Sequence, residues 1–80
     1  MISATRALMR RRAMKKLVAT YGSQRRLGAA IGCSQVYVSQ IVTGAKVLGD
    51  VAAARIVGRL LMRGNRSATL TWMNTGGVRS

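Results

Sequence analysis

The stretch QRRLGAAIGCSQVYVSQI, residues 24–41, holds two short amphipathic segments separated by the three residues GCS. Before this break, Leu27 and Ile31 lie four residues apart, which is the spacing of one helical face. After it, Val38 and Ile41 lie three residues apart, which is a helical spacing too. The pattern therefore predicts two helices whose apolar sides face each other.

The break has the composition of a tight turn between these helices. Gly32 is the residue type that most readily adopts a left-handed conformation at a helix C-terminus. Ser34 is a good N-cap, because its hydroxyl can accept a hydrogen bond from a backbone N–H in the first turn. Gly28 supplies a small residue where two steeply crossing helices touch. The stretch thus predicts a helix-turn-helix with helices over residues 24–31 and 35–43.

Helical spacing predicts two further helices, over about residues 5–21 and 51–62. Ser23 is expected to cap helix 24–31, and Asp50 is expected to act as the N-cap acid of helix 51–62. Besides Leu27, Ile31, Val38 and Ile41, the residues expected to point inward are Met9, Ala13, Met14, Leu17, Val18, Tyr21, Ala30, Ala53, Ile56, Val57 and Leu60, with Val42 partly buried. The arginines that recur at every fourth position of the last helix, Arg55, Arg59 and Arg63, form a stripe whose role stays open.

The segment SATLTWM, residues 67–73, alternates between apolar residues and threonines, which favours a short β-strand. Such a strand needs a partner edge, and a second copy of the chain is one candidate. The alternative is a tail that packs Trp72 against the helices. The last residues, 74–80, are expected to fray.

The charge balance indicates a polyanionic partner. The chain has 80 residues, enough for one small domain, with 14 Lys and Arg against one acid and a net charge of +13. Internal salt bridges cannot neutralise so many cations. Nucleic acid or an acidic membrane surface is therefore the expected partner.

Other classes of protein are disfavoured by the composition. Without histidine, and with one cysteine and one acid, a single chain cannot build the usual metal sites, and Asp50 is the only ordinary general base. We therefore expect no enzymatic activity, metal or cofactor. Cys33 has no partner in the chain, which fits a reducing cytoplasm, and packing in the turn is favoured for it over redox sensing. No apolar run approaches the ~20 residues of a membrane span.

The segment SQRRLGAAIGCSQVYVSQIVTG, residues 23–44, resembles the helix-turn-helix of the Cro/C1-type DNA-binding proteins, typified by repressors and Cro proteins of temperate phages. The matching residues are Gln24, Leu27, Gly28, Ile31, Gly32, Ser34, Gln35, Val38, Ser39, Ile41 and Gly44. The resemblance covers about residues 10–62. Departures are Gly28, where the family often has alanine, and Val36, where many relatives have a polar residue.

The resemblance implies an all-α fold: a compact four- to five-helix lambda-repressor-like domain over residues 1–65. Residues 66–80 would form a C-terminal tail, with the possible strand as a dimerisation element. The second helix of the motif, residues 35–43, would enter the major groove of DNA.

The residues expected to contact bases lie on the outer side of that helix, because Val38 and Ile41 point inward. They are Gln35, Val36, Ser39 and Gln40. Glutamine can pair bidentately with adenine, and a valine can contact the thymine methyl group.

Phosphate contacts are expected around the motif, from helix N-termini, hydroxyls and cations. The candidates are Ser23, Gln24, Arg25, Arg26, Ser34, Tyr37, Thr43 and Lys46. Arg10 and Arg11 join them if the N-terminal helix lies near the duplex.

These observations predict a sequence-specific regulator of transcription that binds double-stranded DNA, of the kind of a phage or prophage Cro-like repressor. It would bind a pseudo-palindromic operator as a homodimer, or as monomers that assemble only on DNA, in a bacterial or phage-infected cell, without a small-molecule effector. One alternative is a basic architectural or RNA-binding protein without sequence specificity. Another is a cationic membrane-active peptide.

Overall fold

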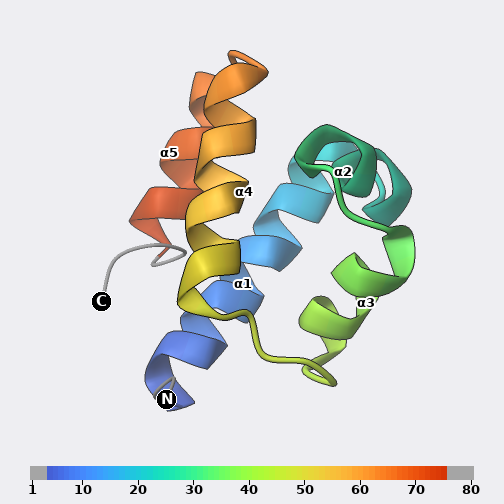
Figure 1. Cartoon of the computed structure of the whole chain (residues 1–80), viewed down its shortest axis with the longest axis vertical. Coiled ribbons are helices and arrows are strands. Elements are labelled where there is room, and N and C mark those ends of the chain that lie inside the picture. Colours follow the sequence, from blue (N-terminus) through green and yellow to red (C-terminus); the bar gives the residue numbers. More distant parts are fainter. Residues whose placement is uncertain (1–3, 76–80) are drawn as a thin grey trace.

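The computed structural model describes residues 4–75 of the chain (Figure 1). Within this range the fold is all-α, with five helices and no strand. The helices are α1 (Ala4–Tyr21), α2 (Gln24–Ile31), α3 (Gln35–Thr43), α4 (Asp50–Met62) and α5 (Arg66–Asn74).

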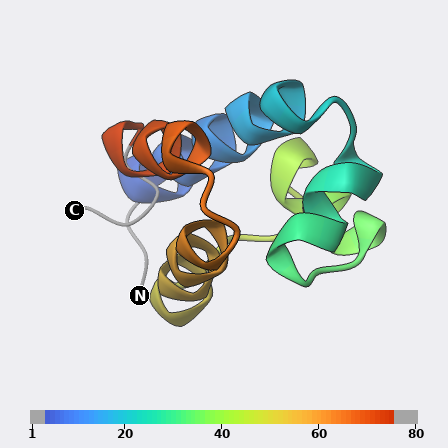
Figure 2. The ribbon, with the colours of Figure 1, turned by 90° about the horizontal axis from the view of Figure 1, so that it is seen from above.

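Helix α1 lies between the two halves of the molecule. Helices α2 and α3 pack on one side of it, α5 packs along the other side, and α4 bridges α5 and α2 (Figures 1 and 2). All five helices and the α3–α4 loop contribute to one apolar core. Its buried residues are Ala13, Met14, Leu17, Leu27, Ile31, Val38, Ile41, Leu48, Ala53, Ile56, Leu60, Ala68 and Trp72.

Most of the inward positions predicted from helical spacing are confirmed, but the prediction for Met9 is wrong. Its side chain is 42% exposed, whereas the next residue, Arg10, is only 2% exposed. The reason is that α1 is covered on two sides, so its buried stripe begins at Arg10 and continues through Ala13 and Leu17. The predicted residues Val18, Tyr21, Ala30, Val42 and Val57 are partly buried.

Arg10 is held by the segment that begins α4. One guanidinium nitrogen donates to the Leu48 carbonyl at 2.8 Å, and the other donates to the Asp50 carboxylate at 2.6 Å. Arg6 lies 3.6 Å from the same carboxylate oxygen. The hydrogen bond from Arg10 holds the pKa of Asp50 below its usual value. The expected N-cap role of Asp50 is wrong: Gly49 is the N-cap, no side chain caps α4, and Asp50 is already its first residue.

The predicted strand in the tail is wrong, because residues 66–74 form α5. Asn65 caps this helix, accepting a hydrogen bond from the Ala68 N–H at 3.0 Å. Ala68 and Trp72 are one helical turn apart, and both are fully buried. The alternative, in which Trp72 packs against the helices, is confirmed. Residues 76–80, part of the segment expected to fray, lie outside the described residues.

Candidate nucleic-acid interface

The turn between α2 and α3 forms as the sequence predicts. Gly32 adopts a left-handed φ of 74° at the end of α2, and the Cys33 N–H donates to the Gly28 carbonyl at 2.8 Å. Ser34 caps α3, because its hydroxyl accepts from the Tyr37 N–H at 3.0 Å. The chain therefore leaves one helix and enters the next within three residues.

Gly28 is required at the place where the two helices touch. A Cβ added at this position would lie 2.6 Å from the Cys33 carbonyl oxygen, which is closer than real Cβ contacts allow. This turn therefore requires glycine at position 28, although the Cro/C1-type motif that residues 23–44 resemble often has alanine there. The close approach fixes how α3 leaves the body of the domain.

The outer side of α3 presents uncharged side chains to solvent. Gln35, Val36 and Gln40 are exposed, with Val36 at 65%, and Ser39 is half-buried. On the inner side, Val38 and Ile41 are buried, so the orientation of α3 is set by the core. This places the four predicted base-contacting residues on the exposed part of one short helix, which we call the outer face of α3 (Gln35, Val36, Ser39 and Gln40).

Several of the predicted phosphate-contacting residues lie at the start of α2. Ser23 is its N-cap and accepts from the Arg26 N–H at 3.1 Å. Gln24 follows as the first helical residue and is half-buried, whereas Arg25 and Arg26 are exposed. The N-terminal end of α2, where the helix dipole is positive, thus carries two exposed cations, an arrangement that suits an anion.

The other end of the motif brings a cation onto an aromatic ring. The Lys46 ammonium lies 5.3 Å from the centre of the Tyr37 ring, which is within cation–π range. Lys46 is exposed and follows the end of α3. Thr43 is also exposed, but its hydroxyl donates to the Gln40 carbonyl at 3.3 Å.

Two residues predicted to contact phosphates, Arg10 and Arg11, instead form hydrogen bonds within the protein. Arg10 is buried and bound to Leu48 and Asp50, so its guanidinium does not face a duplex. Arg11 donates from Nε to the Val42 carbonyl at 2.9 Å, at the C-terminal end of α3. These residues are distant in sequence from their partners, so helical spacing gave no signal for either contact.

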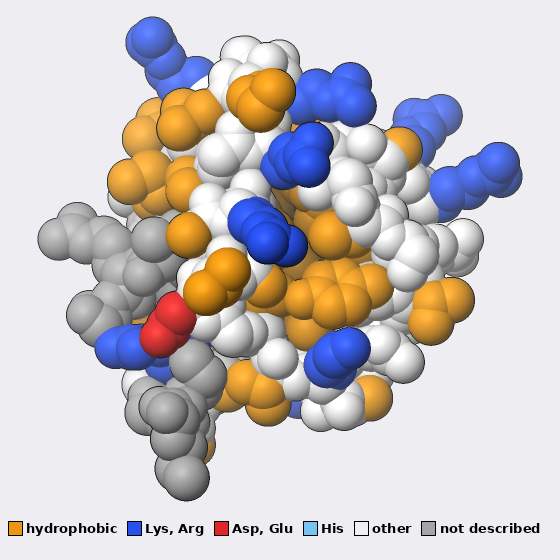
Figure 3. Space-filling model, in the orientation of Figure 1, with side chains coloured by type: hydrophobic (Ala, Val, Ile, Leu, Met, Phe, Trp, Pro, Cys, Tyr) orange, Lys and Arg blue, Asp and Glu red, His pale blue; other side chains and the backbone are white. Residues whose placement is uncertain are grey.

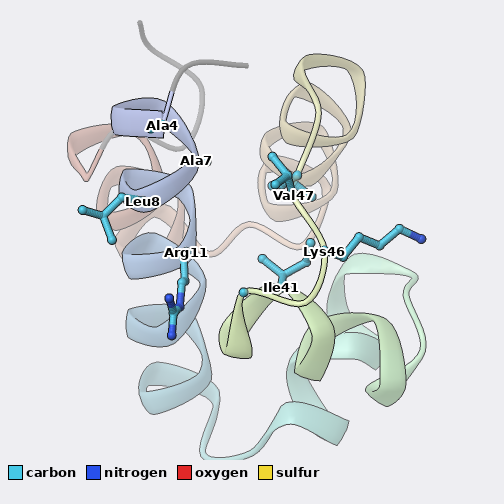
Figure 4. A pocket seen from close by; sticks show the side chains of 9 residues that line it. Ala4, Ala7, Leu8, Arg11, Ile41, Lys46 and Val47 are labelled. Carbon is cyan, nitrogen blue, oxygen red and sulfur yellow. The ribbon is translucent and has the colours of Figure 1, made fainter. Parts of the chain in front are cut away.

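Arg11 lines a cavity of about 270 Å³ between α1 and the segment after α3 (Figure 4). Ile41 and Val47 lie across from α1 in this view. The Arg11 guanidinium is so close to Gly44 that a Cβ there would lie 3.1 Å from it. A cation at the C-terminus of a helix stabilises it, and here it also ties α3 to α1. Arg11 is thus a residue that positions α3.

The structure assigns a role to two members of the arginine stripe, which runs along α4 and ends at the C-cap residue Arg63. Arg63 donates to the Ala29 carbonyl in the last turn of α2 at 3.3 Å. The Arg59 guanidinium lies beside Gly32, where an added Cβ would be 3.6 Å from its Cζ. Both cations therefore lie at the C-terminal end of α2, where the helix dipole favours positive charge. Arg55 is exposed.

Cys33 is half-buried in the turn, and its burial raises the pKa of the thiol. A raised pKa lowers the fraction of reactive thiolate. This agrees with packing in the turn as the role of Cys33. Residues 4–75 hold no group of three or more side chains able to ligate a metal.

None of the described helices is long and apolar enough to cross a membrane. Comparisons with protein-family models, curated proteins and solved structures gave no match for this chain. The function must therefore be argued from the residues and their arrangement.

Proposed function

We propose that this protein is a sequence-specific regulator of transcription that binds double-stranded DNA, in the manner of a Cro-like phage or prophage repressor. The observation that carries the proposal is the outer face of α3. It is uncharged, three of its four side chains are exposed, and it is held by a tight turn within a chain of net charge +13. The resemblance of residues 23–44 to the Cro/C1-type motif supports the same conclusion.

The chemistry of the outer face suits the edges of bases in the major groove. Gln35 and Gln40 each carry an amide that can donate and accept together, as adenine recognition requires. Val36 offers methyl groups for contact with thymine. Each good bidentate contact contributes about 1–3 kcal/mol of discrimination against a wrong base.

Affinity would come from the flanking cations. Arg25 and Arg26 at the start of α2 and Lys46 beyond α3 lie at the two ends of the motif. Contacts of this type fix the register of a protein on DNA without reading its sequence. They also make binding weaken as salt rises, because each neutralised phosphate releases counterions.

We propose further that two copies bind together on a pseudo-palindromic operator. Their half-sites would be about one helical turn, ~34 Å, apart. Because two copies of a chain with net charge +13 repel each other, an apolar surface suits their contact better than a basic one. Such a surface surrounds a hollow of about 410 Å³ between α4 and α5. Its exposed apolar side chains are Leu61, Leu70 and Met73, and one cation, Arg66, lines the hollow beside them.

In this proposal, operator occupancy follows the protein's own concentration in the cytoplasm of a bacterial or phage-infected cell. No small-molecule effector is required. The proposal predicts cooperative binding when both half-sites are present on one duplex.

In vitro selection from a pool of random duplexes tests the proposal. We expect enrichment of one motif with two-fold symmetry, and binding of that duplex at a salt concentration where random duplex is released. Recovery of the pool without enrichment would contradict sequence specificity. A single asymmetric motif would contradict binding as a symmetric dimer.

One observation favours a second candidate, a basic nucleic-acid-binding protein without sequence specificity. Exposed Lys and Arg side chains appear over several parts of the face in Figure 3, whereas acid appears as one red patch. This candidate predicts that random duplex or RNA competes as well as the selected DNA at every salt concentration.

A further inference from the structure

A groove between α1 and α5 gathers three basic side chains that the proposed DNA-reading surface does not use. Arg12, Lys15 and Lys16 line it from α1, and Asn74 and Thr75 line it from the end of α5. The groove has a volume of about 470 Å³, and the three cations are exposed. We call this set of three cations the α1 basic groove.

The α1 basic groove lies away from the outer face of α3. Helices α3 and α5 both pack on α1, and the two ribbon views place them on opposite sides of the molecule (Figures 1 and 2). A duplex bound against α3 would therefore leave the groove open to solvent. The groove is a separate surface and not an extension of the first one.

The charge of the groove is not neutralised within residues 4–75. The single acid of the chain, Asp50, is bound by Arg10, and the three groove cations make no ion pair or side-chain hydrogen bond in this part of the chain. Like charges three and four residues apart on a helix repel each other. Proximity to the C-terminal end of α5 offsets part of this repulsion, because that end of a helix favours cations. An external polyanion would offset the rest.

We propose that the α1 basic groove binds the phosphate backbone of a second DNA duplex, so that one protein molecule bridges two duplexes. The inference rests on the proposed function, which supplies the first duplex. Neighbouring cations on one helix suit a DNA backbone, whose phosphates are closely spaced. A membrane surface fits less well, because surface helices that bind lipid need a broad apolar face beside their cations. In the groove the one large apolar side chain is Met9.

Capture of one duplex by another tests this inference. The duplex recovered by selection is immobilised, the protein is added, and a fluorescent random duplex is then offered in low salt. We expect the natural protein to capture the second duplex. The triple variant R12Q/K15Q/K16Q should capture at least about tenfold less, while its affinity for the immobilised duplex changes less than about threefold, since it loses backbone contacts on one surface only.

Two controls make the outcome decisive. The variant R25Q/R26Q/K46Q removes three cations from the proposed DNA-reading surface. Its main effect should be a lower affinity for the immobilised duplex. The variant R63Q removes an exposed cation that lies at the C-terminal end of α2, outside both surfaces, and should bridge normally. Thermal melting of each variant shows whether α1 and α5 still pack, and K15Q/K16Q replaces the triple variant if that one is unfolded.

The possible results separate this inference from the proposed function. If the natural protein binds no duplex specifically, the proposed function is contradicted. Specific binding without capture of a second duplex would overturn the bridging inference alone, as would capture that the groove variants retain. Binding of RNA or anionic vesicles, but not of a second duplex, to the groove would also overturn it.

Discussion

Two helix pairs in this molecule, α2–α3 and α4–α5, use the same local signals for different purposes. Each pair turns at a glycine with positive φ, Gly32 at 74° and Gly64 at 70°. Each second helix starts from a polar N-cap, Ser34 or Asn65, that accepts a backbone hydrogen bond. The signals for a turn are thus equal in the two pairs.

The pairs differ in what their second helices expose. Helix α3 buries two aliphatic side chains and exposes mostly amide and hydroxyl groups. Helix α5 buries a tryptophan and exposes Leu70 and Met73. The comparison shows that capping decides where the helices begin, whereas the outward residues decide what each pair can contact. For α3 we propose DNA, and for α4–α5 a second copy of the chain.

Among the variants that test this comparison, Trp72→Ala should have the largest effect on stability. The side chain is fully buried where α5 meets the rest of the core, so its loss should cost about 3–5 kcal/mol of the free energy of unfolding. Chemical denaturation followed by circular dichroism measures this. A loss below about 1 kcal/mol would show that α5 is not part of the folded core.

Gly28→Ala tests the contact within the α2–α3 pair. The added methyl group would meet the Cys33 carbonyl, so overpacking should cost about 1–3 kcal/mol. Gly58→Ala is the matched control within α4, because a Cβ there meets nothing within 4 Å. This control should stabilise the protein by about 0.5–1 kcal/mol, since alanine is the better helix former. If Gly28→Ala and Gly58→Ala changed the melting temperature equally, the close approach at Gly28 would be refuted.

Removing the N-caps compares the two turns directly. Ser34→Ala and Asn65→Ala should each cost about 1 kcal/mol through a lost capping bond. The loss should be greater for Asn65, whose amide also donates to the Tyr21 hydroxyl at 3.2 Å. Urea denaturation of both variants provides the measurement. A larger loss for Ser34 would reverse the predicted order.

The smallest effect should be the pH dependence set by Asp50, which ties the start of α4 to α1. Its pKa is lowered in the folded protein, so its contribution to stability is present above the unfolded pKa of about 4. It is lost as the pH falls through the lower folded value. The melting temperature should therefore fall in acid for the natural protein. The variant Asp50→Asn should be less stable at neutral pH and should lack this acid dependence.

The sequence predicts α2 and α3 closely because their caps, glycines and apolar spacing agree. The strand predicted over residues 67–73 is wrong because the alternation of Ala68, Leu70 and Trp72 with threonines also fits a helix that buries residues four apart. The helical pair Ala68 and Trp72 is the one that becomes buried once α1 is nearby. Arg10 and Arg11 could not be placed for a similar reason. Their partners lie more than thirty residues away, so only tertiary packing reveals them.

The central claim is that the outer face of α3 distinguishes base sequences. It is tested most directly by the affinity of Gln35→Ala for the selected duplex and for random duplex, measured at one salt concentration. We predict that affinity for the selected duplex falls by about 1–3 kcal/mol while affinity for random duplex is unchanged. Arg25→Ala, the matched control, should weaken both alike. Equal losses on both duplexes for Gln35→Ala would contradict the account.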